Sequence, residues 1–268
     1  MKIGKLSYIL SAFVAFSAFT ACDSIDEDER YVLGDAVIAK RNVLIEDFTG
    51  QFCVNCPNAH EVIDALKAGE NGESIIAVSI HAGPSAIPAP AGLKTKEGDE
   101  YANKWNIPAY PKGIINRNPT VLDFKDWSAV VRTELEKETS VDMDLSATLS
   151  MDGTSVVIKT DLNPVKDING KLQLWITESN IVALQQLPGG GYDGNYVHNH
   201  VFRSSVNGTW GEEISLSANV YDTKQHSIAV NEKWNAENLS VVAFVYNDSE
   251  GVLQIVETPV KSLQKIEQ

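Results

Sequence analysis

Residues 43–57 read VLIEDFTGQFCVNCP, and this stretch decides the fold of the first half of the chain. The apolar run 42–48 is short and bounded, which favours a buried strand. Residues 58–67 then carry apolar side chains at the i, i+3, i+4 and i+7 spacing of an amphipathic helix. Cys53 and Cys56 stand between the two elements, so the sequence predicts a CxxC pair at a strand-to-helix junction.

This position of the cysteines indicates a redox site. The thiolate of Cys53 would be favoured by the N–H groups and the dipole at the start of the predicted helix. It would attack a substrate disulfide, and Cys56, one turn further, would resolve the mixed disulfide. Pro57 falls in the first helical turn, where a missing N–H costs little. Two alternatives stay open: a structural disulfide without exchange activity, and a metal site that recruits His60.

Two segments resemble thioredoxins. Residues 44–56 resemble the active-site segment, and residues 102–111 (ANKWNIPAYP) resemble the stretch that leads to the cis-proline of that fold. The resemblance implies that Asp47 is a buried proton acceptor for the resolving thiol. It also implies that Pro111, preceded by Tyr110, faces the disulfide and helps to bind extended substrate. The dipeptide between the cysteines is Val-Asn where thioredoxins have Gly-Pro, so the direction of electron flow stays open.

The remainder of the first half alternates strands with helices. Strands are expected at 74–80 and 113–116, and a helix at 127–135 with Asp126 as its N-cap. This alternation implies an α/β layer with some parallel pairing.

The sequence changes character near residue 140. Residues 141–149 alternate apolar and polar side chains, which is the period of a half-buried strand, and a turn leads to a partner strand at 155–161. Further strands are predicted at 171–177, 197–205, 213–220, 227–230, 240–246 and 253–260. A series of short strands without a helix favours a β-sandwich. The expected fold class is therefore an α/β thioredoxin-like domain at 36–139, followed by an all-β immunoglobulin-like sandwich at 140–268.

Histidines raise two further questions. His81 opens a Pro-, Ala- and Gly-rich insertion, which is either a lid with His81 adjacent to the substrate or a surface connection. His198 and His200 would point to one face of a predicted strand. With His226 or Asp193 they would form a metal site, and the alternative is a packed, hydrogen-bonded network. We predict no metal and no cofactor.

The first residues have the pattern of an export signal. Residues 1–21 combine a basic start with an apolar run at 9–19 that is too short to span a bilayer. Cys22 follows small residues at a site that resembles a lipobox, so we expect lipid attachment at Cys22. The alternative is simple cleavage near Ala21. Residues 22–35 form an acidic tether, either a plain spacer or a signal for surface export.

Charge excludes several classes of partner. Removal of the signal peptide takes away two lysines and no acid, so the net charge of −14 becomes −16. Such acidity argues against nucleic-acid binding and against electrostatic adhesion to anionic lipid. We expect the N-terminal lipid to hold the protein to a membrane.

The chain as a whole resembles the outer membrane protein 28-related lipoproteins of the Bacteroidetes. The resembling stretches lie in both halves, at 48–57, 80–83, 110–117, 197–203 and 210–212. We expect a location in the cell envelope, at the outer membrane. The favoured function is thiol–disulfide exchange with envelope proteins, supported by a partner that recycles the cysteines. The alternative is a surface binding or adhesion lipoprotein, in which the thioredoxin-like domain is a scaffold and the disulfide is structural.

Overall fold

The computed structural model describes residues 40–262, so the predicted signal peptide, Cys22 and the acidic tether lie outside the described residues. The α-helices are α1 (Cys56–Lys67), α2 (Lys96–Lys104) and α3 (Trp127–Leu135). The strands are β1 (Val43–Thr49), β2 (Ile75–His81), β3 (Lys112–Ile115), β4 (Val141–Leu149), β5 (Ser155–Pro164), β6 (Ile168–Glu178), β7 (Ile181–Gln186), β8 (Tyr192–His198), β9 (Val201–Ser205), β10 (Glu212–Leu216), β11 (Asp222–Ala229), β12 (Leu239–Asn247) and β13 (Gly251–Pro259). Within residues 40–262, every helix is too short or too polar to cross a membrane.

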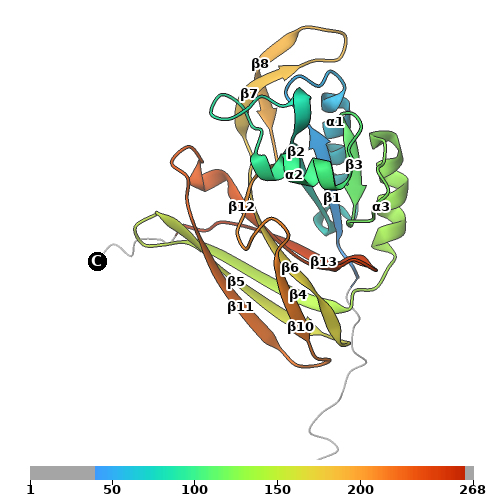
Figure 1. The fold of residues 1–268 in the computed structure, drawn as a ribbon, viewed down its shortest axis with the longest axis vertical. Helices are drawn as coiled ribbons and strands as arrows, with labels where there is room; N and C mark the ends of the chain where they lie inside the picture. The colour runs from blue at the N-terminus through green and yellow to red at the C-terminus, as the bar shows by residue number, and fades with distance from the viewer. Residues whose placement is uncertain (1–39, 263–268) are drawn as a thin grey trace, which may run out of the picture. The chain divides into compact units, whose positions relative to one another are not determined.

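One eight-stranded sheet runs through both halves of the chain (Figure 1). Its order is β13-β12-β6-β9-β2-β1-β3, and β10 pairs with β6 beside this path. β1 and β2 are parallel, as the strand–helix alternation predicts, and β3 is antiparallel to β1. β2 meets β9 in parallel through Ser79 and Val201, which joins the first half to the second. The fold is therefore mostly β, with a mixed sheet at its centre.

The two faces of β1 pack against different layers because strand side chains alternate. Val43 and Ile45 face α1 and α3, in an apolar cluster that includes Ile63 and Trp127. Leu44 and Phe48 face the opposite side. There they belong to a cluster that α2 joins through Tyr101 and Ala102, and to which the second half adds Trp175, Phe202 and Phe244.

A second sheet, β11-β5-β4, covers the strands of the second half. Alternate residues of β4 and β5, among them Val141, Met143, Val156 and Ile158, are buried against β6, β12 and β13. The alternation predicted for residues 141–149 is confirmed. The third sheet is the β7–β8 hairpin.

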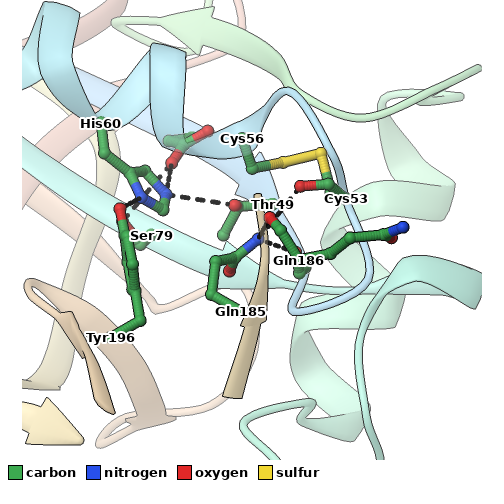
Figure 2. Close-up of a disulfide and its surroundings, with 10 residues drawn as sticks. Thr49, Cys53, Cys56, His60, Ser79, Gln185, Gln186 and Tyr196 are labelled. Carbon is green, nitrogen blue, oxygen red and sulfur yellow. Dashed lines mark hydrogen bonds and ion pairs between the residues drawn. A yellow bond between two sulfur atoms is a disulfide. The ribbon is translucent and has the colours of Figure 1, made fainter. Parts of the chain in front are cut away.

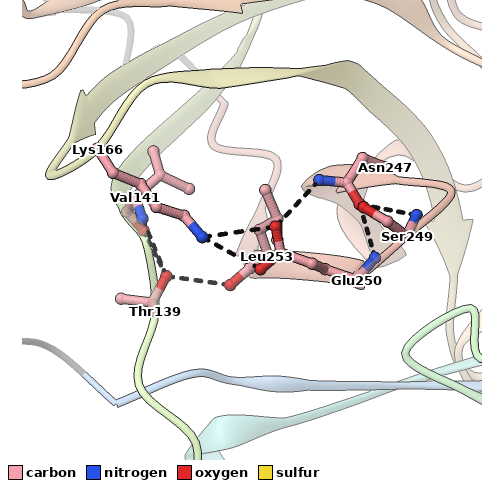
Figure 3. Close-up of polar contacts among 7 residues, drawn as sticks. All are labelled: Thr139, Val141, Lys166, Asn247, Ser249, Glu250 and Leu253. Carbon is pink, nitrogen blue, oxygen red and sulfur yellow. Dashed lines mark hydrogen bonds and ion pairs between the residues drawn. The ribbon is translucent and has the colours of Figure 1, made fainter.

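The passage between the two halves lies between α3 and β4, where the sequence changes character. Thr139 is buried there, and its Oγ1 lies 2.8 Å from the carbonyl of Val141 and 3.0 Å from that of Leu253 in β13 (Figure 3). Asn247 is the last residue of β12, and its side-chain oxygen accepts hydrogen bonds from the backbone N–H groups of Ser249 and Glu250 in the turn that follows (Figure 3). The described residues belong to one compact unit. The division of the chain into two domains, at 36–139 and 140–268, stays a prediction.

Three local expectations were wrong. The strand expected at 197–205 is two strands, β8 and β9, because His200 between them adopts a left-handed φ of 55°. His198 and His200 therefore do not share a strand face. The insertion that His81 opens was expected to be a loop up to residue 101, but its residues 96–101 belong to α2, which Thr95 caps by accepting a hydrogen bond from Gly98. Asp126 precedes α3 but makes no side-chain cap.

Candidate functional site

The cysteines lie where β1 passes into α1 (Figure 2). Cys56 is the first residue of α1, and Pro57 follows in its first turn, as expected. Cys53 and Cys56 form a disulfide with their Cα atoms 5.4 Å apart. Gly50 allows the loop to pass against the backbone of Ser85, with which a Cβ at this position would collide. The local sequence therefore places the disulfide at the N-terminal end of a helix.

The disulfide is only narrowly exposed. Cys53 is 4% exposed and Cys56 is fully buried. Apolar side chains surround the disulfide at the surface: Phe52 and Val54 are 46% and 36% exposed, and Phe52 meets the ring of Tyr192 edge-on. A partner that reached Cys53 would therefore contact apolar side chains first.

Asp47 is fully buried on the face of β1 that α1 covers. Its Oδ2 lies 3.4 Å from the hydroxyl of Ser79, which donates to it, and 3.5 Å from Nε2 of His60. The other carboxylate oxygen, Oδ1, has no hydrogen-bond partner among the described residues. The carboxylate thus lies beneath the helix that carries Cys56, in contact with a second titratable group of that helix.

His60 connects this layer to the second half of the chain. Its Nε2 is 3.2 Å from the hydroxyl of Thr49, and its Nδ1 is 2.8 Å from the hydroxyl of Tyr196 in β8. Figure 2 shows Tyr196 and Thr49 on either side of the imidazole. His60 was considered in the sequence only as a metal ligand, and its bond to Tyr196 spans a sequence separation of 136 residues.

The β7–β8 hairpin is tied to the cysteine loop. The buried amide of Gln185 donates to the carbonyls of Cys53 at 3.0 Å and Gly50 at 3.4 Å. The backbone N–H of Gln186 donates to the carbonyl of Gln51 at 2.8 Å. Strand β7 was not predicted. The only sequence signal for a hairpin here was the Gly-rich stretch 188–191, which lies between β7 and β8.

Pro111 lies beside the same loop. The Tyr110–Pro111 bond is cis. Lys112 pairs with Phe48 across β3 and β1, so Pro111 lies level with Thr49, where β1 ends. Tyr110 is partly buried, and burial raises the pKa of its hydroxyl, as does the charge of Asp99 to a smaller extent.

His81 is buried rather than at the surface. Its ring packs edge-on against that of His198, with centroids 5.3 Å apart, and the ring nitrogens of both residues lack hydrogen-bond partners among the described residues. Burial, followed by the charge of His198, holds the pKa of His81 well below its usual range. Burial, followed by the charge of His60, lowers the pKa of His198 to about 4. Both imidazoles are therefore neutral at pH 7.

A cavity of about 40 Å³ lies among His60, His81, His198 and His200. Its volume suits one or two water molecules, which would bond the free ring nitrogens. In residues 40–262, no group of three or more His, Cys, Asp or Glu side chains is arranged to hold a metal ion.

Comparison with known proteins defines the family. The model of the family described as Outer membrane protein Omp28 matches residues 98–264, more than half of the chain. The protein belongs to this family of outer membrane proteins. Its place is therefore the cell envelope, at the outer membrane. No curated protein matches the chain.

A solved structure shows a similar fold. HBP35 of Porphyromonas gingivalis is 16% identical, with a TM-score of 0.67 over 85% of this chain and 79% of that chain. A domain of the outer membrane lipoprotein Omp28 from Porphyromonas gingivalis is 21% identical, with a TM-score of 0.34 over 47% of this chain and 92% of that chain. At these identities, the likeness to HBP35 concerns the fold alone.

Proposed function

We propose that this protein is an envelope lipoprotein that exchanges thiols and disulfides through Cys53 and Cys56. In this proposal residues 36–139 are a thioredoxin-like unit and residues 140–268 an immunoglobulin-like sandwich that shares its sheet. The observation that carries the proposal is the position of the disulfide: it lies at the start of α1, the helix whose His60 contacts the buried carboxylate of Asp47, and Pro111 lies level with the end of β1 that leads into the cysteine loop.

The reaction would proceed in two displacements. In the reduced protein the Cys53 thiolate attacks a substrate disulfide, which forms a mixed disulfide and releases one substrate thiolate. Cys56 then loses its proton to Asp47 and attacks the Cys53 sulfur. This step releases the second substrate thiol and leaves the Cys53–Cys56 disulfide. The substrate gains two electrons, and a thiol reductant in the envelope restores the cysteines. An oxidase would run the same steps in reverse.

The surroundings of the disulfide favour protein substrates. Phe52, Val54 and Tyr192 present exposed apolar surface next to Cys53. An extended polypeptide would pack against these side chains and approach Cys53 alongside Pro111 and Tyr110. His81 is buried against His198, so it would lie behind this surface and would not touch the substrate.

The reduction potential of the cysteine pair tests the proposal. Catalytic pairs fall at about −270 to −120 mV, and structural disulfides lie below about −300 mV. We expect a value in the catalytic range, and we expect Cys56→Ser to accumulate mixed disulfides with envelope proteins through Cys53. Cys53→Ser is the matched control that should trap none at this position. A potential below −300 mV together with no trapped partner would refute exchange.

The low exposure of Cys53 favours a second candidate, a binding lipoprotein with a structural disulfide. In that case the hairpin that holds the cysteine loop would never open, and the second half would present the interface. A variant with both cysteines changed to serine would then keep full binding to its ligand.

The lipid anchor is part of the proposal. Cys22 would be acylated and would become the first residue once residues 1–21 are removed, which leaves Cys53 and Cys56 as the remaining cysteines of the chain. Metabolic labelling with palmitate should mark the protein and should fail for Cys22→Ser. Labelling that persists in this variant would place the lipid elsewhere.

A further inference from the structure

A cavity of about 490 Å³ lies on the face of the sheet opposite the disulfide. Its walls include Lys104 and Trp105 at the end of α2, Arg117 after β3, and Trp210 and Tyr246 from the second half. A volume of this size is typical of small-molecule sites. The proposed redox mechanism uses none of these side chains. Arg117 and Trp210 belong to two of the sequence stretches that resemble the family, and the redox proposal uses neither residue.

Arg117 is the unusual residue in this wall. Its side chain is only 2% exposed, although it carries a permanent charge. Aromatic rings surround the guanidinium, with Tyr246 at 4.2 Å and Phe244 at 4.7 Å from Cζ to the ring centroid. Its Nε and Nη2 have no hydrogen-bond partner among the described residues. Buried donors without partners are costly, so their presence calls for an acceptor.

Glu46 only partly supplies that acceptor. Its carboxylate lies 3.8 Å from Nε of Arg117, beyond hydrogen-bond distance, and neither of its oxygens has a hydrogen bond among the described residues. Burial raises the pKa of Glu46 to about 7, so a proton competes with Arg117 for this carboxylate near neutral pH. These two nitrogens of Arg117 therefore lack a hydrogen-bonded acceptor among the described residues.

The charge around the cavity points the same way. Lys104, Arg117 and Lys171 contribute three cations, against Asp248. Lys171 pairs with Glu213 at 3.2 Å, whereas Lys104 has no ion pair within residues 40–262. Arg117 has the carboxylate of Glu46 at 3.8 Å, so Lys104 is the cation of this lining that has no ion pair among the described residues. An anion would be drawn to it.

We propose that this cavity binds a small organic acid whose carboxylate is carried on a ring. The carboxylate accepts hydrogen bonds from the planar guanidinium of Arg117, a geometry that suits the two groups. The ring lies against Trp105 and Trp210, which offer the flat apolar surface that a ring stacks on. Lys104 sits at the rim and strengthens the attraction. An aromatic acid and a uronic acid both present this chemistry.

Calorimetric titration of the full chain tests the site. The probes are benzoate and glucuronate, and the uncharged controls are benzyl alcohol and methyl glucoside. We expect at least one acid to bind saturably, at least 10-fold more tightly than its uncharged control. The acid that binds identifies the kind of ring. If neither acid binds saturably, or if the uncharged control binds as well, the proposal is wrong.

Variants locate the binding. Arg117→Gln should weaken the acid at least 10-fold. Lys104→Gln should weaken it several-fold, whereas Lys96→Gln, at a fully solvated position of the same helix, should leave it unchanged. If Arg117→Gln does not fold, Lys104→Gln and Trp105→Ala decide the matter, and wild-type affinity in both would overturn the proposal. Changing both cysteines to serine should leave this binding intact, so the site and the redox proposal succeed or fail separately.

Discussion

At the scale of single residues, Gln185 holds the hairpin to the cysteine loop. Gln185→Leu removes the donors to Cys53, Gly50 and Gln186 while keeping the side-chain size. We expect the free energy of unfolding to fall by about 1–3 kcal/mol, because buried carbonyls lose their donors. We also expect dithiothreitol to reduce the disulfide faster.

Thiol release measured against time checks the second expectation. Gln186→Leu is the control, because the Gln186 side chain makes no hydrogen bond in residues 40–262. Equal reduction rates for both variants would mean that the amide of Gln185 does not hold the hairpin closed.

Glu46 should make stability depend on pH. Its pKa is raised from 4.5 to about 7 in the folded protein, first by burial, while the charge of Arg117 opposes the shift. Between these values the folded chain holds a proton that the unfolded chain releases, so stability falls as pH rises through this window. The loss attributable to Glu46 is at most about 3 kcal/mol.

Urea unfolding at pH 5 and pH 8 checks this. Glu46→Gln should lose less stability between the two values than the wild type, even if it is less stable throughout. Glu61→Gln, at an exposed position of α1, should keep the wild-type difference. An unchanged pH difference in Glu46→Gln would contradict the prediction.

At the scale of elements, the β7–β8 hairpin depends on its bond to α1. Tyr196→Phe removes the hydroxyl that His60 contacts at 2.8 Å. We expect about 1 kcal/mol less stability for the hairpin, and faster amide hydrogen exchange in residues 181–198. Tyr192→Phe, where the ring is 58% exposed, should leave exchange unchanged. Protection that is identical in the two variants would show that the hairpin is held by other contacts.

The loop between β1 and α1 depends on the absence of a side chain at Gly50. Gly50→Ala would force the backbone of Ser85 away and weaken its bond to Phe52 N–H. We expect a loss of about 1–3 kcal/mol, as for other overpacked sites. Gly194→Ala is the matched control, because nothing lies within 4 Å of the added Cβ. Thermal melts compare the two, and a Gly50→Ala protein as stable as the control would refute the close approach.

Sequence predicts elements whose signal is local. Three patterns involve only the residues of one element: the apolar run of β1, the amphipathic stripe of α1 and the alternation of β4. Each of these elements was found close to its expected bounds. The break between β8 and β9 depends on one left-handed residue, and β7 lacks a strong period, so neither could be predicted.

The same limit applies to the candidate site. Cys53, Cys56 and Asp47 lie within ten residues of one another, so their proximity can be inferred from one strand and one helix. Gln185, Tyr196 and the cavity of Arg117 depend on contacts between distant parts of the chain. Those contacts follow from how strands of both halves enter one sheet, which no local pattern encodes.

At the scale of the whole molecule, the shared sheet argues that neither half folds alone. Leu44, Phe48 and Ile80 of the first half pack in one cluster with Trp175 and Phe244 of the second. A fragment of residues 36–139 would expose this face to water. We expect it to lack a near-ultraviolet circular dichroism signal and to aggregate, whereas residues 36–268 unfold cooperatively. A cooperative unfolding transition in the short fragment would show that the halves are independent domains.

Neighbouring carboxylates on β1 have opposite surroundings, because Glu46 faces the aromatic cluster and Asp47 faces α1. A single-residue insertion or deletion inside Val43–Thr49 would exchange the two faces of everything beyond it. It would place Asp47 among the aromatic rings, or Glu46 against α1. Natural variants of this protein should therefore tolerate replacements in this strand more readily than any change in its length, and should accumulate length changes in loops such as 187–191 instead.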